Sequence, residues 1–76
     1  MAYPSYLSSQ NIPTNADTEG NWKALYANSA GDIKVRMKGG MDEVFTVAAS
    51  QLLPVGCNKV YNSGTTVSNG NLTGLN

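Results

Sequence analysis

The sequence predicts an all-β fold, a small antiparallel β-sandwich or barrel with an extended N-terminal arm. Residues 32–38 alternate apolar and charged side chains, and a period of two is typical of a strand with one buried face. Clusters of glycine, asparagine and serine separate this segment from other short apolar segments. The chain has 76 residues, so we expect a single domain.

Residues 1–21 have a different composition from the rest of the chain. They are polar, contain Pro4 and Pro13, and show no apolar periodicity, so they cannot bury enough surface to fold alone. Two interpretations stay open, a disordered tail and an extended arm that becomes ordered against a neighbouring subunit. The apolar side chains of Tyr3, Tyr6, Leu7 and Ile12 favour the arm. We therefore divide the chain into an arm (1–21) and a β module (22–76).

The first two strands of the module are expected at 22–27 and 32–38, with a turn at 28–31. In the second strand Ile33, Val35 and Met37 share one face, and charged residues occupy the other. A helix would scatter these three apolar side chains around its circumference. Residues 32–38 are therefore predicted to form a half-buried strand.

A glycine pair after this strand predicts a hairpin turn. A three-residue loop over 39–41 would place apolar residues opposite apolar residues, with Gly40 in a left-handed conformation. In this register Val44 falls on the outer face, and Glu43 falls on the inner face opposite Met37. The expected pairs are Lys38 with Asp42, Val35 with Phe45, and Ile33 with Val47.

Three further segments complete the expected module. Residues 52–55 are apolar and extended, and Pro54 suggests an edge strand or a strand start because proline cannot donate to a ladder. Residues 57–61 are expected to form a strand followed by a turn at 62–64. The polar segment 65–76 is expected to add one or two edge strands.

The composition argues against an enzyme and against a metal or cofactor site. The chain has no histidine, one cysteine and five scattered carboxylates, so catalytic bases and metal ligands are poorly supplied. We expect Cys57 to be a small buried hydrophobic residue. Asp42 and Glu43 are adjacent on a strand and point to opposite faces, so they cannot share one acid–base site.

Net charge and hydropathy limit the classes of partner that we expect for this chain. Five basic and five acidic residues cancel, and Lys34, Arg36 and Lys38 are expected to form a solvated sheet face, so no nucleic-acid partner is expected. No apolar segment approaches the roughly 20 residues of a membrane helix, and no targeting segment is expected.

A chain of this length buries little surface, so its core is only marginally stable alone. With one cysteine and few metal ligands, we expect oligomerisation to supply the missing stability.

Short motifs in a fixed order give a resemblance to a known family. They are Ala24-Leu25-Tyr26, 31–35, 45–47, Leu52-Leu53-Pro54-Val55, Val60 and 63–66, which together span Trp22 to Thr66. In this order and spacing the chain resembles the small head-decoration (cement) and spike-base proteins of tailed bacteriophages and gene transfer agents. The polar arm and the ending 71–76, which lacks an aliphatic-aromatic closing pair, depart from that pattern.

The resemblance implies a non-enzymatic decoration protein on the outer capsid surface of a virion, assembled in the host cytoplasm. Its implied partners are the major capsid protein and other copies of itself, with a trimer favoured and a pentamer or hexamer possible. The alternatives are a head spike or fibre base and, from another class, a small carbohydrate-binding β module that uses Trp22 and the tyrosines. The residues expected at capsid or subunit interfaces are Tyr3, Tyr6, Leu7, Ile12, Trp22, Tyr26, Leu52 and Leu53.

Overall fold

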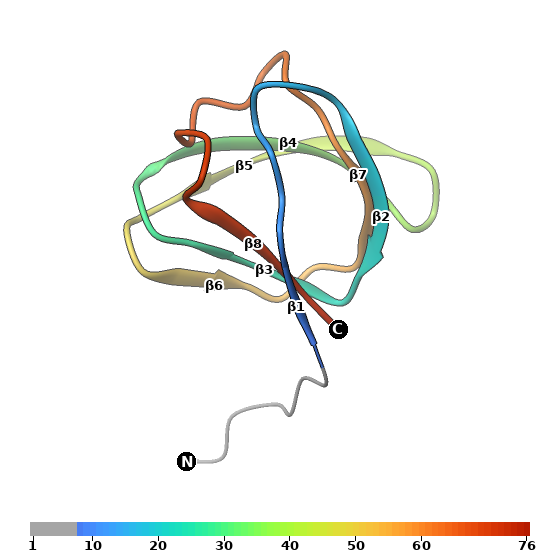
Figure 1. Cartoon of the computed structure of the whole chain (residues 1–76). Helices are drawn as coiled ribbons and strands as arrows, with labels where there is room; N and C mark the ends of the chain where they lie inside the picture. The colour runs from blue at the N-terminus through green and yellow to red at the C-terminus, as the bar shows by residue number, and fades with distance from the viewer. Residues whose placement is uncertain (1–7) are drawn as a thin grey trace.

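The computed structural model describes residues 8–76 as two facing four-stranded sheets, in which every strand pair is antiparallel (Figure 1). Among these residues there is no helix, and the predicted antiparallel sandwich or barrel is confirmed. Sheet A has the order β1 (Ser9–Asn11), β8 (Leu72–Leu75), β3 (Ala24–Ala27) and β6 (Gln51–Leu53). Sheet B has the order β2 (Thr18–Trp22), β7 (Cys57–Val60), β4 (Gly31–Met37) and β5 (Asp42–Val47).

The module begins earlier in the chain than expected. β1 pairs with β8 and β2 pairs with β7, so residues 9–11 and 18–21, which were assigned to the arm, belong to the two sheets. Between them the backbone N–H of Ile12 donates to the Leu72 carbonyl at 2.9 Å, and the Ile12 side chain is fully buried. The segment between β1 and β2 crosses from one sheet to the other. Ile12 is the large apolar side chain that it contributes to the core, so its sequence shows no apolar periodicity. Residues 1–7 lie outside the described residues.

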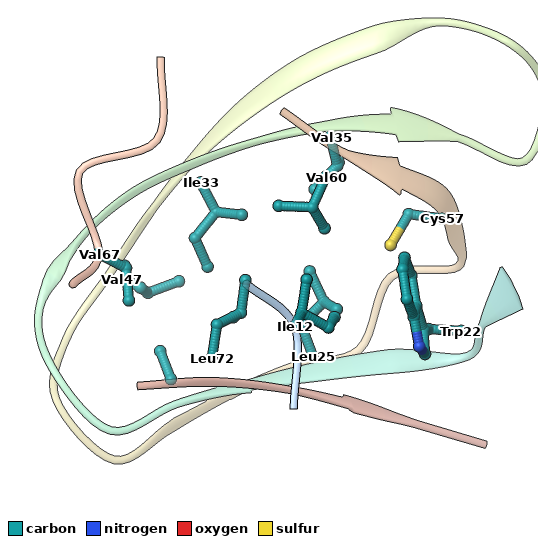
Figure 2. Packing of buried hydrophobic residues seen from close by; sticks show 11 residues of the cluster. Ile12, Trp22, Leu25, Ile33, Val35, Val47, Cys57, Val60, Val67 and Leu72 are labelled. Atoms are coloured by element: carbon teal, nitrogen blue, oxygen red, sulfur yellow. The ribbon is translucent and has the colours of Figure 1, made fainter. Parts of the chain in front are cut away.

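The core fills the space between the two sheets (Figure 2). Side chains from both sheets and from the crossing segments meet there, and Met37, Phe45 and Leu53 pack against the rim. Among residues 8–76 the one buried polar side chain is that of Thr14, so no charged side chain of this part of the chain lies in the interior. The core residues are Ile12, Trp22, Leu25, Ala27, Ile33, Val35, Val47, Cys57, Val60, Val67 and Leu72.

Two glycines make room for the largest core side chain. Trp22 is 1% exposed, and its ring lies over Gly20 on its own strand and Gly74 on β8. A Cβ atom at Gly74 would lie 2.3 Å from Trp22 Cδ1, and one at Gly20 would lie 2.3 Å from Cζ2. The indole N–H donates to Gln10 Oε1 at 3.4 Å, so the ring is held by both sheets. These positions therefore require glycine because of the space that the indole occupies.

The hairpin between β4 and β5 has the expected faces but not the expected register. Ile33 pairs with Phe45 and Arg36 pairs with Asp42, which is two residues away from the predicted pairing. The predicted pairing of Lys38 with Asp42 is therefore wrong, because the three-residue loop is 38–40 and is closed by Met37 N–H donating to the Met41 carbonyl at 2.7 Å. A shift of two residues keeps each side chain on its face.

Three further residues of the hairpin, Gly40, Val44 and Glu43, can be compared with their predicted positions. Gly40 has a φ of 96°, as predicted for the left-handed turn position. Val44 faces outward, as expected, and is 53% exposed. Glu43 lies opposite Val35 instead of Met37, and it is exposed because β5 is an edge strand.

The later strands are partly as predicted. β6 is an edge strand that ends just before Pro54, in agreement with the proline signal. β8 was expected at an edge, yet it lies between β1 and β3 in sheet A. The expectation was wrong because residues 9–11 were assigned to the arm, which left no strand to cover the far side of β8.

We predict that Gly74→Ala destabilises the fold by about 1 to 3 kcal/mol, because the added methyl group would overlap the Trp22 ring and force the core to shift. The measurement is the free energy of unfolding in urea. Gly39→Ala is the matched control, since a Cβ there meets no atom within 4 Å, and we expect a change within about 0.5 kcal/mol. Equal stability of the Gly74→Ala variant and the wild type would contradict this account of Trp22.

Candidate interaction surfaces

The candidate functional regions of this chain are its outer surfaces. Residues 8–76 enclose no pocket, and they hold no group of three or more histidine, cysteine, aspartate or glutamate side chains that could bind a metal ion. Within the same residues, no helix has the length and apolarity to cross a membrane. The outer faces of the two sheets differ in chemistry and are described in turn.

The outer face of sheet B is charged. On β4, Asp32, Lys34 and Arg36 alternate with buried apolar residues, so their side chains point away from the core. Lys59 on β7 pairs with Arg36 on one side and with Glu19 of β2 on the other. Acids and bases are therefore interspersed across this face, in agreement with the solvated face expected for Lys34 and Arg36.

Tyr61, directly after β7, contacts four charged residues on this face. Its hydroxyl group donates to Asp42 Oδ1 at 2.8 Å and accepts from Arg36 Nε at 3.4 Å. Two cations flank the ring, with Lys34 Nζ 5.2 Å and Lys59 Nζ 4.8 Å from its centroid, within the range of cation–π attraction. The hydrogen bond with Tyr61 also raises the pKa of Arg36 above its ordinary value. We call these five residues the tyrosine cluster.

The outer face of sheet A is uncharged. Tyr26 of β3 lies directly opposite Leu52 of β6, and Leu75 of β8 lies opposite Ala24 on the same face. Tyr26, Leu52 and Leu75 are all half-buried, and we call them the apolar patch. An uncharged sheet face with partly exposed apolar side chains is suited to contact with another protein.

The residues that were expected at interfaces differ in burial, and some lie in the core while others lie on an outer sheet face. Ile12 and Trp22 are 0% and 1% exposed and belong to the core, so neither is available to a partner. Leu53 packs against the core from its rim, whereas Tyr26 and Leu52 lie together on the outer face.

Some expected residues are not described by the structure, and one outward-facing residue was not expected. Tyr3, Tyr6 and Leu7 lie outside the described residues. Leu75 was missed, although its odd spacing from the buried Leu72 would have placed it on the outer face of a strand. Burial of the Trp22 ring also removes one of the aromatic side chains that the sugar-binding alternative would use.

Cys57 is buried in the core beside Trp22, as Figure 2 shows. Burial raises the pKa of its thiol from the ordinary 9.0 to about 11, and the charge of Lys38 opposes the shift. A neutral buried thiol is a poor nucleophile, because reactivity belongs to the thiolate. The expectation that Cys57 acts as a small core residue is confirmed by its burial.

Comparison with known proteins gives a structural relative. No family model matches the chain, and no curated protein matches it. Among solved structures, one described as "Capsid of native GTA particle computed with C5 symmetry", where GTA denotes a gene transfer agent, contains a similar chain. The two chains share one fold. The TM-score is 0.79 at 24% sequence identity, and the similarity covers 95% of this chain and 84% of that chain.

We predict that Tyr61→Phe destabilises the protein by about 0.5 to 1.5 kcal/mol, since it removes the hydroxyl group shared by Asp42 and Arg36. The measurement is urea unfolding. Tyr26→Phe is the matched control, because no hydrogen bond of the Tyr26 hydroxyl is seen within residues 8–76, and it should leave stability nearly unchanged. If both variants lose the same stability, the hydrogen bonds of the Tyr61 hydroxyl have no stabilising role.

We also predict that the thiol of Cys57 links stability to alkaline pH. Its pKa is higher in the folded than in the unfolded state, so its contribution is complete below pH 9.0 and is lost as the pH rises towards about 11. The stability difference between wild type and Cys57→Ala should shrink over this range in urea titrations. A difference that stays constant with pH would contradict burial of a neutral thiol.

Proposed function

We propose that this chain is a non-enzymatic virion structural protein, a decoration (cement) protein that binds the outer surface of a phage-like head and stabilises it as a homo-oligomer. The observation that carries the proposal is the shared fold with a chain of a gene-transfer-agent capsid over 95% of this chain. The order of short motifs between Trp22 and Thr66 supports it from sequence. The lack of histidine is consistent with a role without catalysis.

The surface chemistry suits a protein that lies between a shell and solvent. The apolar patch on sheet A offers an uncharged contact surface, and Tyr26 and Leu52 on it were already expected at an interface. The tyrosine cluster gives sheet B a hydrated outer face on the opposite side of the molecule. We assign the patch to the shell, together with Tyr3, Tyr6 and Leu7 of the N-terminal segment.

The proposed partners are the major capsid protein and further copies of this chain. A trimer at a threefold site fits a cement protein, and a pentamer or hexamer fits a fivefold or sixfold site. A ligand that binds only the assembled shell stabilises it by mass action, which is how a small protein can strengthen a large assembly. The proposed location is the outer surface of the virion after assembly in the host cytoplasm.

A head spike or fibre base is the second candidate. The observation that favours it is the order of short motifs between Trp22 and Thr66, because the proteins that share this order include spike bases as well as decoration proteins. The two roles differ in what deletion does. Loss of a cement protein should lower the temperature at which heads rupture, whereas loss of a spike base should remove a peripheral protein and leave head strength unchanged.

We predict that Leu52→Asp weakens binding to preassembled heads by about tenfold or more, because a charge would be desolvated in the contact. The measurement is co-sedimentation with heads that lack this protein. Ser63→Asp is the control, since Ser63 is exposed in the turn that follows Tyr61 on the side of sheet B, and it should bind like the wild type. Wild-type binding by a folded Leu52→Asp variant would overturn the assignment of the patch, and no binding by wild type would overturn the proposed function.

A further inference from the structure

The four sheet edges of the molecule differ in how well they could accept another strand. In sheet A the edge strands β1 and β6 have three residues each, and β6 is followed at once by Pro54. In sheet B the edges are β2 with five residues and β5 with six. Short edge strands and prolines are the usual devices that prevent edge-to-edge pairing. Sheet A is protected in this way. In sheet B the register of β2 against β7 shifts between Glu19 and Trp22, an irregularity that partly protects that edge, whereas β5 pairs regularly and has no such device.

β5 is the least protected of these edges. Its pairing with β4 runs without a bulge from Asp42 to Val47, and it contains no proline or lysine. Val44 on its outer face is 53% exposed, and Met41 just before it is 68% exposed. An exposed regular edge strand with apolar side chains is a template for strand addition. The free edge of β5 is therefore suited to pairing with another strand.

We propose that β5 pairs with β2 of a second copy of this chain, so that sheet B continues from one subunit into the next. The inference rests on the homo-oligomer half of the proposed function and names its subunit contact. It leaves the apolar patch of sheet A free for the shell, because that patch lies on the other sheet.

Strand direction favours this partner. Sheet B has four strands in strict antiparallel alternation, so its two edges, β2 and β5, run in opposite directions. A second copy placed beside the first in the same orientation therefore presents β2 antiparallel to β5. Repetition of one such head-to-tail contact gives a closed ring when the rotation between neighbouring copies divides a full turn evenly.

Charge favours the same pairing. In the antiparallel arrangement the start of β5, with Asp42 and Glu43, lies beside the end of β2, which is followed by the exposed Lys23. Opposite charges thus meet across the contact and help to set its register. A twofold pairing of β5 with itself would instead place both acids beside the uncharged end of the partner strand at Thr46 and Val47, without a basic residue to match them.

The test is the oligomeric state of the purified full chain by native mass spectrometry and light scattering. Val44→Lys places a charge on the edge, and we expect its dissociation midpoint to lie at least about tenfold higher in concentration than that of the wild type. Ser9→Lys adds the same side chain to an exposed edge of sheet A and should assemble like the wild type. An unchanged oligomer in Val44→Lys would overturn the inference and leave the oligomer itself intact.

Cross-linking identifies the partner strand. In this arrangement the exposed Asn21, near the end of β2, lies close to the start of β5 in the next copy, so the double variant Val44→Cys, Asn21→Cys should oxidise to a ladder of oligomers. The buried Cys57 should keep the wild type free of such products. Disulfide dimers from Val44→Cys alone would show β5 pairing with itself and overturn the assignment of β2. A wild-type chain that is monomeric at its highest soluble concentration would overturn both the inference and the oligomeric half of the proposed function, whereas binding to heads tests the other half.

Discussion

The packing of Trp22 between two glycines is the interaction on which the rest of the structure depends. A chain of 76 residues has few large apolar side chains, so a single indole supplies much of the volume between the sheets. Trp22 is the last residue of β2, and the next residue, Lys23, donates its N–H to the Leu75 carbonyl of sheet A at 2.8 Å. The ring is therefore buried where the chain passes from one sheet to the other, and its position sets the spacing of both.

With the inner faces of both sheets committed to this core, the two outer faces are free to differ. Sheet B carries the tyrosine cluster, in which one aromatic ring organises three cations and one carboxylate. Sheet A carries an uncharged patch. Two sheets of four short strands thus provide two chemically distinct surfaces and the exposed edge of β5, features that suit a protein whose proposed role is to join other proteins.

Local patterns in the sequence predicted faces well and long-range pairing poorly. The alternation around Ile33 and Val35 identified β4 and its buried face, because period two is a property of the strand alone. The hairpin register was two residues off, since a two-residue shift preserves every face and pattern alone does not distinguish the alternatives. Ile12 was assigned to the arm because a single apolar residue in a crossing segment leaves no periodic signal. On the surface, Tyr26 and Leu52 were expected at an interface as large apolar or aromatic residues of short strands, and both lie on the outer face of sheet A. The tyrosine cluster depends on Tyr61 meeting Asp42 and Arg36, which are 19 and 25 positions away in sequence, and no local pattern encodes these contacts.

The position of β8 has a consequence for when the molecule can fold during synthesis. Only β4 and β5 pair with a sequence neighbour, and such a hairpin forms within about 1 to 10 microseconds. Sheet A, in contrast, has Leu72–Leu75 as an interior strand between β1 and β3, so it cannot close while those residues are still inside the ribosome. A nascent chain therefore lacks a finished sheet A until residue 75 has emerged. A truncated chain without β8 would therefore have an incomplete sheet A and would lack Leu75, one of the three residues of the apolar patch.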